Sequence, residues 1–557
     1  MVDAAVLDRL DDIADRAVAL RDARDARAIA PPRVSLWEAQ TVGLELAGYV
    51  AGEYAGDVEW APLDVGTASI ELPAEHPLAM WAARWYARDK QVVVLRVDPP
   101  GREPWRNRWC GTMSECITTQ DEGGDRVTRL VFMHDLEQLN HIPVWPNPVL
   151  PASLQVPKVF QMLMKAKSLL ATTLMLQLLR QHGPVAGFNL PDDVLRFESW
   201  AAQWNWRQWP MIIHPSNYLD DKTPLRYLGA RMDMFLDVAR PICEDVQLSI
   251  TIRRWFPGDP DPWLGARLTT PGQMIVDFED KSGWFEGTST EGTIGRGLLR
   301  TVLEVADGAV EEVRRVVDER PDAPEYEVSG WLGVAPQQPY VTYLTHGAAN
   351  MVTGAEETYT PPTVGKITVG GQSMPGVNET MSATVKVVFN LLGSLIPGGA
   401  GFGTIVDDAV SPIYENTTLA FMTLQLILRT RRLGWGHYCE DTDVGNIPAW
   451  TVEAFMALRA LRRATEGEES MTIDVGDGLP YAIGEHWHVG DRIGAQSLSN
   501  PDRIVALTCQ KLQLNWSAES PHSYTATLGK WPRRDPVLWA INFVGQVARD
   551  LQTQGLL

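Results

Sequence analysis

Two histidines stand two positions apart in His486-Trp487-His488, within a stretch whose pattern predicts a β-strand. Residues i and i+2 of a strand point to the same face, so the two imidazoles would lie side by side. Imidazole pairs are frequent zinc ligands, but a zinc site takes three or four protein ligands. No carboxylate or thiol follows at the spacing of a known metal motif, and we therefore expect no metal at this pair.

An acidic stretch between residues 440 and 446 has the oxygen-rich composition of a calcium-binding loop. Such a loop needs a bidentate glutamate at its twelfth position, where this chain has Val452, and Glu453 falls one residue late. We therefore expect a solvated turn and not a calcium site. The residues concerned are Glu440, Asp441, Asp443, Gly445 and Asn446.

The chain carries no Walker loop, nucleophile elbow, HExxH motif or dinucleotide fingerprint. The glycines of Gly292–Gly297 are in the wrong order for the last of these. Asp277 and Glu279 would share one strand face, yet the sequence neither shows nor excludes a pair of carboxylates lining a glycosidase cleft. We therefore expect no catalytic residue, no metal ligand and no cofactor.

The charge balance limits the partners of the chain. Its 557 residues include 70 acidic and 49 basic side chains, for a formal net charge of −21. Tight binding of DNA or RNA needs clustered lysines and arginines, so the balance argues against a nucleic-acid ligand. It does not exclude DNA passing by, because an acidic wall would not hold the phosphates.

The cysteines are five, scattered, and without a CxxC pair, which indicates free or buried thiols and neither a disulfide framework nor a zinc site. The charged N-terminus is not a signal peptide, so synthesis and folding in the bacterial cytoplasm is the simplest interpretation. The cysteines are Cys110, Cys116, Cys243, Cys439 and Cys509.

The composition is that of a globular protein, and the length predicts several domains. Short strand-like runs such as VSLWEA (34–39) alternate with helical stretches, which predicts a β-rich α+β class. We expect six segments: an N-terminal helix (1–32), a first β-rich domain (33–150), a helical segment (151–240), a middle α+β region (241–375), a glycine-rich apolar loop with flanking helices (376–430), and a closing β-rich domain with a C-terminal helix (431–557).

Periodicity predicts individual elements within these segments. The first helix, over 4–29, could form a trimer seam, dock elsewhere or pack on its own domain. Strands are expected at 246–256 and 274–280, near 365–370 and throughout 471–530. Further helices are expected at 157–181, 224–239, 296–319, 413–430, 448–463 and 536–553.

Tryptophan is unusually frequent, with 21 residues and a cluster at Trp200, Trp204, Trp206 and Trp209. Large rings anchor protein interfaces and also fill the cores of β-rich domains. The sequence leaves both possibilities open.

Several stretches, in order, resemble the baseplate hub or minor tail proteins of actinobacterial siphophages, the family related to tail-associated-lysin hubs. No single motif is diagnostic, and the ordered set, which spans about residues 57–530, carries the resemblance. The stretches are Asp57–Pro77, Trp109–Met113, Phe132–Pro148, Phe256–Pro260, Val276–Gly283, Val369–Pro375, Gly434–Glu440 and Gly478–Ile493.

The resemblance implies a homotrimer in which two β-barrel-like domains of each subunit continue the tail tube as a ring. It implies a place at the virion tail tip, beside the distal tail protein, the tape measure protein and other minor tail proteins. The role would be mechanical: joining the tube to the tip, closing the channel, and letting phage DNA pass without specific binding during ejection.

The segment Val387–Val406 has no charged residue over 20 positions, which is enough for a helix to span hydrocarbon. Its glycines, crowded around a proline, cost too much helix propensity for a stable span. It is either a buried hairpin or a loop that three subunits bring together to plug the channel or contact the host membrane. The candidate loop residues are Leu391, Leu392, Leu395, Ile396, Pro397, Gly398, Gly399 and Phe402.

Two other functions remain open. A tail protein that binds a host receptor or glycan would use exposed tryptophans. A cell-wall-degrading tail lysin would need a carboxylate pair in a cleft. A trimer in solution would favour the hub, and a monomer that hydrolyses cell wall would favour the lysin.

Overall fold

The computed structural model describes residues 30–281, 341–346, 351–372, 421–448 and 467–529, with short gaps at 102, 185–189, 192–193, 222, 224, 478–480 and 520–521, and a few residues within 18–26 and 457–465. The chain divides into two compact units. The first comprises Met1–Lys281, Pro339–Glu356 and Met471–Trp531, and the second comprises Ser282–Gln338, Glu357–Ser470 and Pro532–Leu557.

A 13-stranded sheet organises the first unit. Eleven strands follow the order β14-β18-β21-β20-β3-β4-β7-β6-β5-β1-β2, while β19 pairs with β20 and β13 with β19. The early strands are β1 (Arg33–Ala39), β2 (Leu44–Tyr49), β3 (Ala55–Trp60), β4 (Thr67–Pro73), β5 (Val93–Asp98), β6 (Trp109–Gln120) and β7 (Arg126–His134). The late strands are β13 (Thr342–Tyr343), β14 (Val352–Thr360), β18 (Glu468–Val475), β19 (Arg492–Gln496), β20 (Ile504–Ser517) and β21 (Ser523–Gly529).

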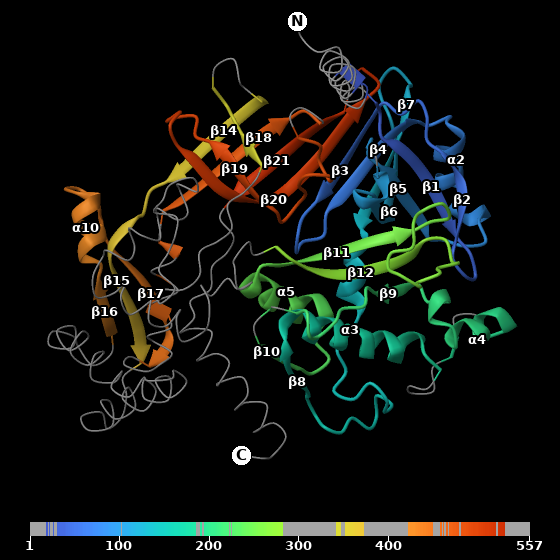
Figure 1. The fold of residues 1–557 in the computed structure, drawn as a ribbon, viewed down its shortest axis with the longest axis horizontal. Coiled ribbons are helices and arrows are strands. Elements are labelled where there is room, and N and C mark those ends of the chain that lie inside the picture. The colour runs from blue at the N-terminus through green and yellow to red at the C-terminus, as the bar shows by residue number, and fades with distance from the viewer. Residues whose placement is uncertain are drawn as a thin grey trace, which may run out of the picture. The chain divides into compact units, whose positions relative to one another are not determined.

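The two β-rich blocks at opposite ends of the sequence meet at one strand pair. β20 lies antiparallel to β3, with Leu512 opposite Trp60 and Ser517 opposite Ala55. In Figure 1 the blue early strands and the red late strands therefore form one continuous layer. Among the described strands the sheet does not close on itself, since β14 and β2 stand at its two ends.

The side chains of this sheet form one large hydrophobic core. Buried residues come from both blocks, with Ile70 and Phe132 from the early strands and Leu512 and Leu528 from the late ones. Alternating burial along β3 and β21 fits strands with one buried face. Helix α2 (Pro77–Ala83) and the 3₁₀ turn η1 (Trp85–Ala87) follow β4.

A second layer contains the small sheet β11-β12-β9 and two helices. Its strands are β9 (Met211–Ile213), β11 (Leu248–Trp255) and β12 (Gln273–Asp280), and its helices are α3 (Ala166–His182) and α5 (Phe235–Val246). Figure 1 shows α3 and α5 beneath β11 and β12, and these helices and strands share a second hydrophobic core. The remaining elements of this unit are η2 (Pro104–Arg106), η3 (Asp135–His141), η4 (Trp206–Gln208), α4 (Phe197–Gln203), β8 (Phe160–Lys165) and β10 (Leu225–Ala230).

The described part of the second unit contains a three-stranded sheet in the order β16-β15-β17. Its strands are β15 (Val364–Gln372), β16 (Phe421–Gln425) and β17 (Tyr438–Pro448), and helix α10 (Ile427–Leu433) follows β16. β15 pairs antiparallel with β16 and parallel with β17. In the described part of this unit, Val364, Ile367, Val369 and Leu458 form a small hydrophobic core.

The β-rich α+β class is confirmed, and so are the strands expected at 246–256 and 274–280, which appear as β11 and β12. Two helix predictions are wrong at their N-terminal ends. Residues Phe160–Lys165 and Leu225–Ala230 form the antiparallel pair β8 and β10. Both segments contain good helix formers, and pairing with a distant strand overrides that local preference.

Two further predictions are wrong in the second unit. Within the helix expected over 413–430, Phe421–Gln425 form strand β16, and only the last residues of that range lie in a helix, α10. The acidic stretch 440–446, expected as a solvated turn, lies within strand β17. Both strands pair with β15, a contact that local sequence does not encode. The two units are discontinuous in the sequence, because they are defined by spatial contacts. They do not test the six expected segment boundaries, which remain a prediction.

Several predicted segments lie outside the described residues: the helices over 296–319 and 536–553, most of the helix over 4–29, and the apolar segment Val387–Val406. All eight candidate loop residues fall in that apolar segment. The role of the loop therefore stays a prediction.

Candidate functional site

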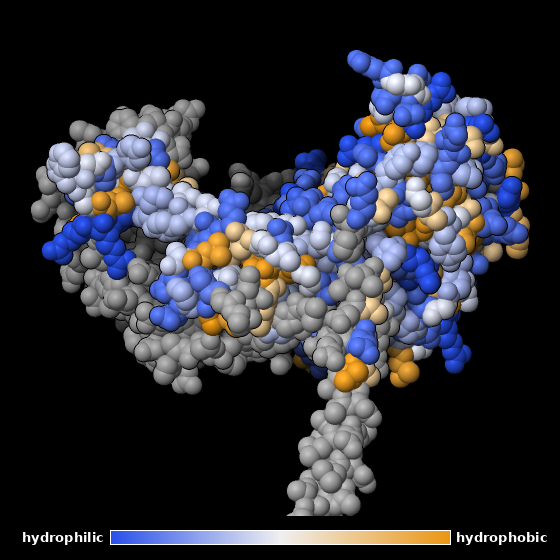
Figure 2. Space-filling model, turned by 90° about the horizontal axis from the view of Figure 1, so that it is seen from above, coloured by the Kyte–Doolittle hydropathy of each residue, from blue (hydrophilic) through white to orange (hydrophobic). Residues whose placement is uncertain are grey.

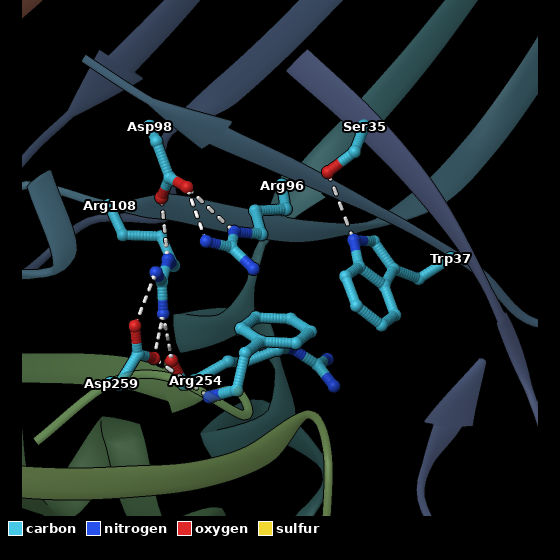
Figure 3. A network of polar contacts seen from close by, with 8 residues as sticks. Ser35, Trp37, Arg96, Asp98, Arg108, Arg254 and Asp259 are labelled. Carbon is cyan, nitrogen blue, oxygen red and sulfur yellow. Dashed lines mark hydrogen bonds and ion pairs between the residues drawn. The ribbon is translucent and has the colours of Figure 1, made fainter. Parts of the chain in front are cut away.

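A buried arginine joins the large sheet to the second layer (Figure 3). Arg108, just before β6, donates through Nε to Asp98 at 2.6 Å and through Nη1 to the carbonyl of Arg254 at 2.9 Å. Both of its terminal nitrogens also donate to Asp259, in the turn after β11. Burial opposes the charge of Arg108, but these two carboxylates outweigh it and raise its pKa.

Aromatic rings surround the same junction. The guanidinium carbons of Arg96 and Arg108 lie 4.5 and 5.0 Å from the ring centre of Phe256. The Trp37 ring packs 4.5 Å from Phe256 and donates to Ser35 at 3.0 Å. These contacts place an apolar cluster beside the ion pairs and exclude water from them.

A second ion pair fixes β11 to the exit of β7. Arg254 donates to the two oxygens of Asp135 at 2.7 Å each, and both side chains are buried. Inside the second layer, Arg226 on β10 donates to Asp245 on α5 at 2.6 Å. Pairs of this kind cost much to break, because the partner left behind keeps a buried charge.

A cavity of about 290 Å³ lies beside this junction, within the first unit. Its wall is formed by the end of β3, the η2 turn, β11, the end of β12 and residues 484–491. Asn107 holds the last of these segments in place, since its Nδ2 donates to the carbonyl of Ile483 at 2.8 Å. The cavity is the strongest candidate for a binding site among the described residues.

The charges in its wall are mostly neutralised. Lys281 contacts Asp491 at 2.8 Å and Glu279 at 3.2 Å. Burial opposes the charge of Lys281, but Asp491 and then Glu279 outweigh it and raise the pKa of the lysine. Burial likewise opposes the charge of Glu279, but Lys281 outweighs it and lowers the pKa of the glutamate. Burial together with the neighbouring Lys281 lowers the pKa of His488 to about 4. At neutral pH these groups therefore have fixed charges, which suits ion pairing better than proton transfer.

The histidine pair does not form the expected strand face. Residues 484–486 form a turn, and β19 begins only at Arg492. His486 is exposed, whereas His488 packs edge-on against Trp60 at 5.5 Å. Across the residues that the structure describes, no group of three or more histidine, cysteine, aspartate or glutamate side chains is placed to hold a metal ion.

Asp277 and Glu279 do lie on the same strand, β12, as expected. Asp277 contacts Lys167 at 3.4 Å, and Glu279 contacts Lys281. Both carboxylates are therefore engaged by lysines.

All five cysteines are free thiols in the structure. Cys110, Cys243 and Cys509 are buried, and burial is the main cause that raises the pKa of each thiol. A raised pKa disfavours the thiolate that acts as a nucleophile. These three residues are therefore core side chains.

The tryptophan cluster divides between core and surface. Trp209 is buried and Trp206 stacks on Trp263 at 6.3 Å, whereas Trp204 is 75% exposed. Phe197, at the start of α4, is 84% exposed. On the face drawn in Figure 2, hydrophobic residues form several separate groups among hydrophilic ones. Among the described residues, no helix has the length and hydropathy that crossing a membrane requires.

Sequence reasoning missed the junction residues. Arg108, Asp259, Arg254 and Asp135 belong to no catalytic or metal motif. A local signal exists for one of them: Arg254 interrupts the apolar alternation of β11, and a charged residue at a core position of a strand indicates a buried partner. Nothing local identifies that partner.

The chain is similar to a known protein family and to individual phage proteins. The family described as Siphovirus ReqiPepy6 Gp37-like protein matches residues 33–530. The chain is 31% identical over 526 residues to minor tail protein Gp28 of Mycobacterium phage D29, covering 86% of both chains. It is 29% identical over 562 residues to minor tail protein Gp28 of Mycobacterium phage L5, covering 92% of this chain and 93% of that protein.

Two solved structures are similar at low identity. The tail protein from Neisseria meningitidis MC58 matches with a TM-score of 0.37 and 10% identity, covering 91% of this chain and 99% of that chain. The 43 kDa tail protein of prophage MuSo2 from Shewanella oneidensis matches with a TM-score of 0.38 and 8% identity, again covering 91% and 99%.

Proposed function

The chain belongs to the Siphovirus ReqiPepy6 Gp37-like protein family, and from this premise we propose that it forms the trimeric baseplate hub at the tail tip of a long-tailed phage. The resemblance to siphophage minor tail proteins is confirmed, so the chain is a component of the virion tail. In the proposed role it joins the tail tube to the tip, closes the channel before host contact and then lets DNA pass.

The continuous sheet is the observation that best supports this role. The β1–β7 block and the β18–β21 block share the β3–β20 pair, so each subunit would contribute two linked β-domains to a ring. Ring assembly through sheet edges would cover the strands that are left at its two ends. We assign the two tube-forming domains to these two blocks.

The buried ion pairs also suit a mechanical part. Arg108 with Asp259 and Arg254 with Asp135 attach the second layer to the large sheet at fixed geometry. A rigid junction transmits displacement between its parts instead of absorbing it. We also propose that the chain is not an enzyme, which the minor tail proteins that it resembles support.

The partners we propose are two further copies of the chain, the distal tail protein, the tape measure protein and other minor tail proteins. DNA would traverse the lumen without specific contacts, since a net charge of −21 favours a neutral to acidic wall. The apolar segment that contains Leu395 and Ile396 would plug this lumen or contact the host membrane.

Mass measurement in solution and imaging of the intact tail test the proposal together. The expected result is three copies around a channel at the tail tip, with a lumen that is not lined mainly by lysine and arginine. A monomer that hydrolyses host cell wall would contradict the hub and favour the tail lysin.

A second candidate function, host-receptor or glycan binding, is favoured by the exposed rings of Phe197 and Trp204 around α4. Exposed aromatic side chains stack on apolar sugar faces and anchor protein partners. Binding of the purified protein to isolated host envelope, lost in Trp204→Ala and kept in Trp435→Ala, would support this function. Trp435 is the matched control because its ring is exposed too, but it does not belong to α4 or its neighbourhood in the sequence.

A further inference from the structure

Arg253 differs from the other cations around the cavity of the first unit. It lies on β11, and its guanidinium carbon is 5.3 Å from the ring centre of Trp105. The backbone of Arg253 pairs with Ile275 in the β11–β12 ladder. Its side chain lines the cavity and makes no hydrogen bond or ion pair with any residue that the structure describes. Its five N–H donors are therefore available to a ligand.

Three other cations of the cavity wall are each paired with a carboxylate. Lys281 is matched by Glu279 and Asp491, Arg108 by Asp98 and Asp259, and Arg106 by Glu103. Of these cations in the described part of the wall, Arg253 alone has no carboxylate in ion-pair contact. Burial lowers its pKa, and the attraction of Glu279 and Asp277 does not offset that effect. Arg253 is partly buried, and a partly desolvated charge without a close ion-pair partner is costly, which favours binding of one negative charge.

We propose that this cavity binds a single carboxylate group, held by Arg253 in a two-pronged hydrogen bond beside the Trp105 ring. The planar guanidinium fork matches the two oxygens of a carboxylate. A volume of about 290 Å³ accommodates such a group with a few water molecules. The observations behind this site do not depend on the trimeric assembly proposed above.

The wall also discriminates against phosphate. Glu279 and Asp491 line the same cavity, and their negative charges repel a dianion more strongly than a monoanion. One unmatched cation compensates one negative charge and leaves the second charge of phosphate uncompensated. The ligand class is therefore a carboxylate, whether from a small molecule or from an aspartate or glutamate of another protein copy.

Binding is measured on the full-length protein with sodium acetate as the probe, inorganic phosphate as the competitor class and sodium chloride as the ionic-strength control. Acetate is expected to raise the melting temperature more than chloride at equal ionic strength, because a ligand that binds only the folded state stabilises it. Arg253→Gln is expected to weaken acetate binding about tenfold or more, because the variant loses the charge-assisted hydrogen bonds of the guanidinium to the carboxylate. Arg106→Gln, which changes an arginine of the same wall already paired with Glu103, is the matched control and should bind as the parent does.

Arg253→Lys keeps the charge without the fork and serves as the second variant if Arg253→Gln fails to fold. It is expected to fold and to bind acetate more weakly than the parent. Sedimentation separates the two sources of the carboxylate. Loss of self-association in both Arg253 variants assigns it to a second copy, and unchanged association assigns it to a free small molecule.

Equal acetate binding by the parent and both Arg253 variants, together with unchanged association, would overturn the proposal. Arg253-dependent stabilisation by phosphate but not by acetate would also overturn it, because the ligand class would then be wrong.

Discussion

Arg254 and Asp135 form a two-bond ion pair, with both nitrogen–oxygen distances at 2.7 Å, between strand β11 and the start of η3. The residues are 119 positions apart in the sequence, and both side chains are buried. Burial opposes the charge of Arg254, but Asp135 outweighs it and raises the arginine pKa. The pair thus stays charged in the core and fixes one layer of the first unit to the other.

Removing one partner of this pair should be costly. Arg254→Ala is expected to lower the free energy of unfolding by about 3–5 kcal/mol, because Asp135 would keep an uncompensated buried charge. Guanidinium unfolding followed by tryptophan fluorescence measures the change. Arg106→Ala, which breaks an exposed pair, should cost at most about 1 kcal/mol. The double variant Arg254→Met with Asp135→Leu should recover part of the lost stability. Equal costs for Arg254→Ala and Arg106→Ala would contradict a buried, charged Arg254–Asp135 pair.

Gly484 is expected to tolerate no side chain. Its φ is +79°, and a Cβ would lie 1.4 Å from Nδ2 of Asn107, which is held by its bond to Ile483. Gly124 is the matched control, because its φ is +90° and a Cβ there meets no atom within 4 Å. Gly124→Ala should therefore cost only the left-handed backbone strain of about 1–2 kcal/mol. Gly484→Ala should lose clearly more free energy of unfolding in the same denaturation assay. Similar losses for the two variants would mean that the cavity wall shifts to make room for the added methyl group.

The pH dependence of stability should report on His488. Its folded pKa of about 4 lies below the ordinary value near 6.5, so the unfolded chain takes up the proton first as the pH falls. The contribution of His488 is complete above about pH 6.5, declines towards pH 4 and changes no further below it. The charged and titratable groups around it are Lys281, Asp491, Glu279 and His134.

Urea midpoints between pH 8 and 4 measure this effect as the difference between the parent and His488→Gln. The parent should lose more stability than the variant on acidification. His141→Gln, at an exposed histidine, should behave as the parent does. Parallel curves for the parent and His488→Gln would contradict the buried, uncharged state of this ring.

The apolar segment gives a prediction that rests on sequence alone. Replacing Leu395 and Ile396 by aspartate should leave the trimer folded and impair DNA retention or delivery by assembled tails. Leu219→Asp, at a position 83% exposed, controls for a general effect of added charge. Failure of the double variant to fold would make the segment ordinary core and remove its proposed role.

Elemental analysis should find no stoichiometric zinc or calcium in the purified protein. The prediction rests on the absence of further ligands at motif spacing around His486 and His488. A bound metal that disappears when either histidine is replaced would contradict it.

The sequence by itself determined the β-rich class, the strands β11 and β12, the free thiols and the family. These properties depend on patterns within a few residues or on ordered similarity along the chain, both of which are readable without coordinates. The resembling stretches even contain Asp135 and Asp259, although nothing in the sequence indicated their partners.

Only the tertiary structure decided which distant segments meet. Pairing of β20 with β3 places Gln513 opposite Glu59, 454 positions away, where its side-chain Nε2 donates to the Glu59 carboxylate at 3.3 Å. The backbone pairing of two such distant strands leaves no periodic trace in either of them. The same reason explains why Phe160–Lys165 is a strand: its helix-forming residues pair with β10. The partners of Arg108 and the open donors of Arg253 likewise follow from packing between layers, because burial and charge neutralisation are properties of the folded chain and not of the local sequence.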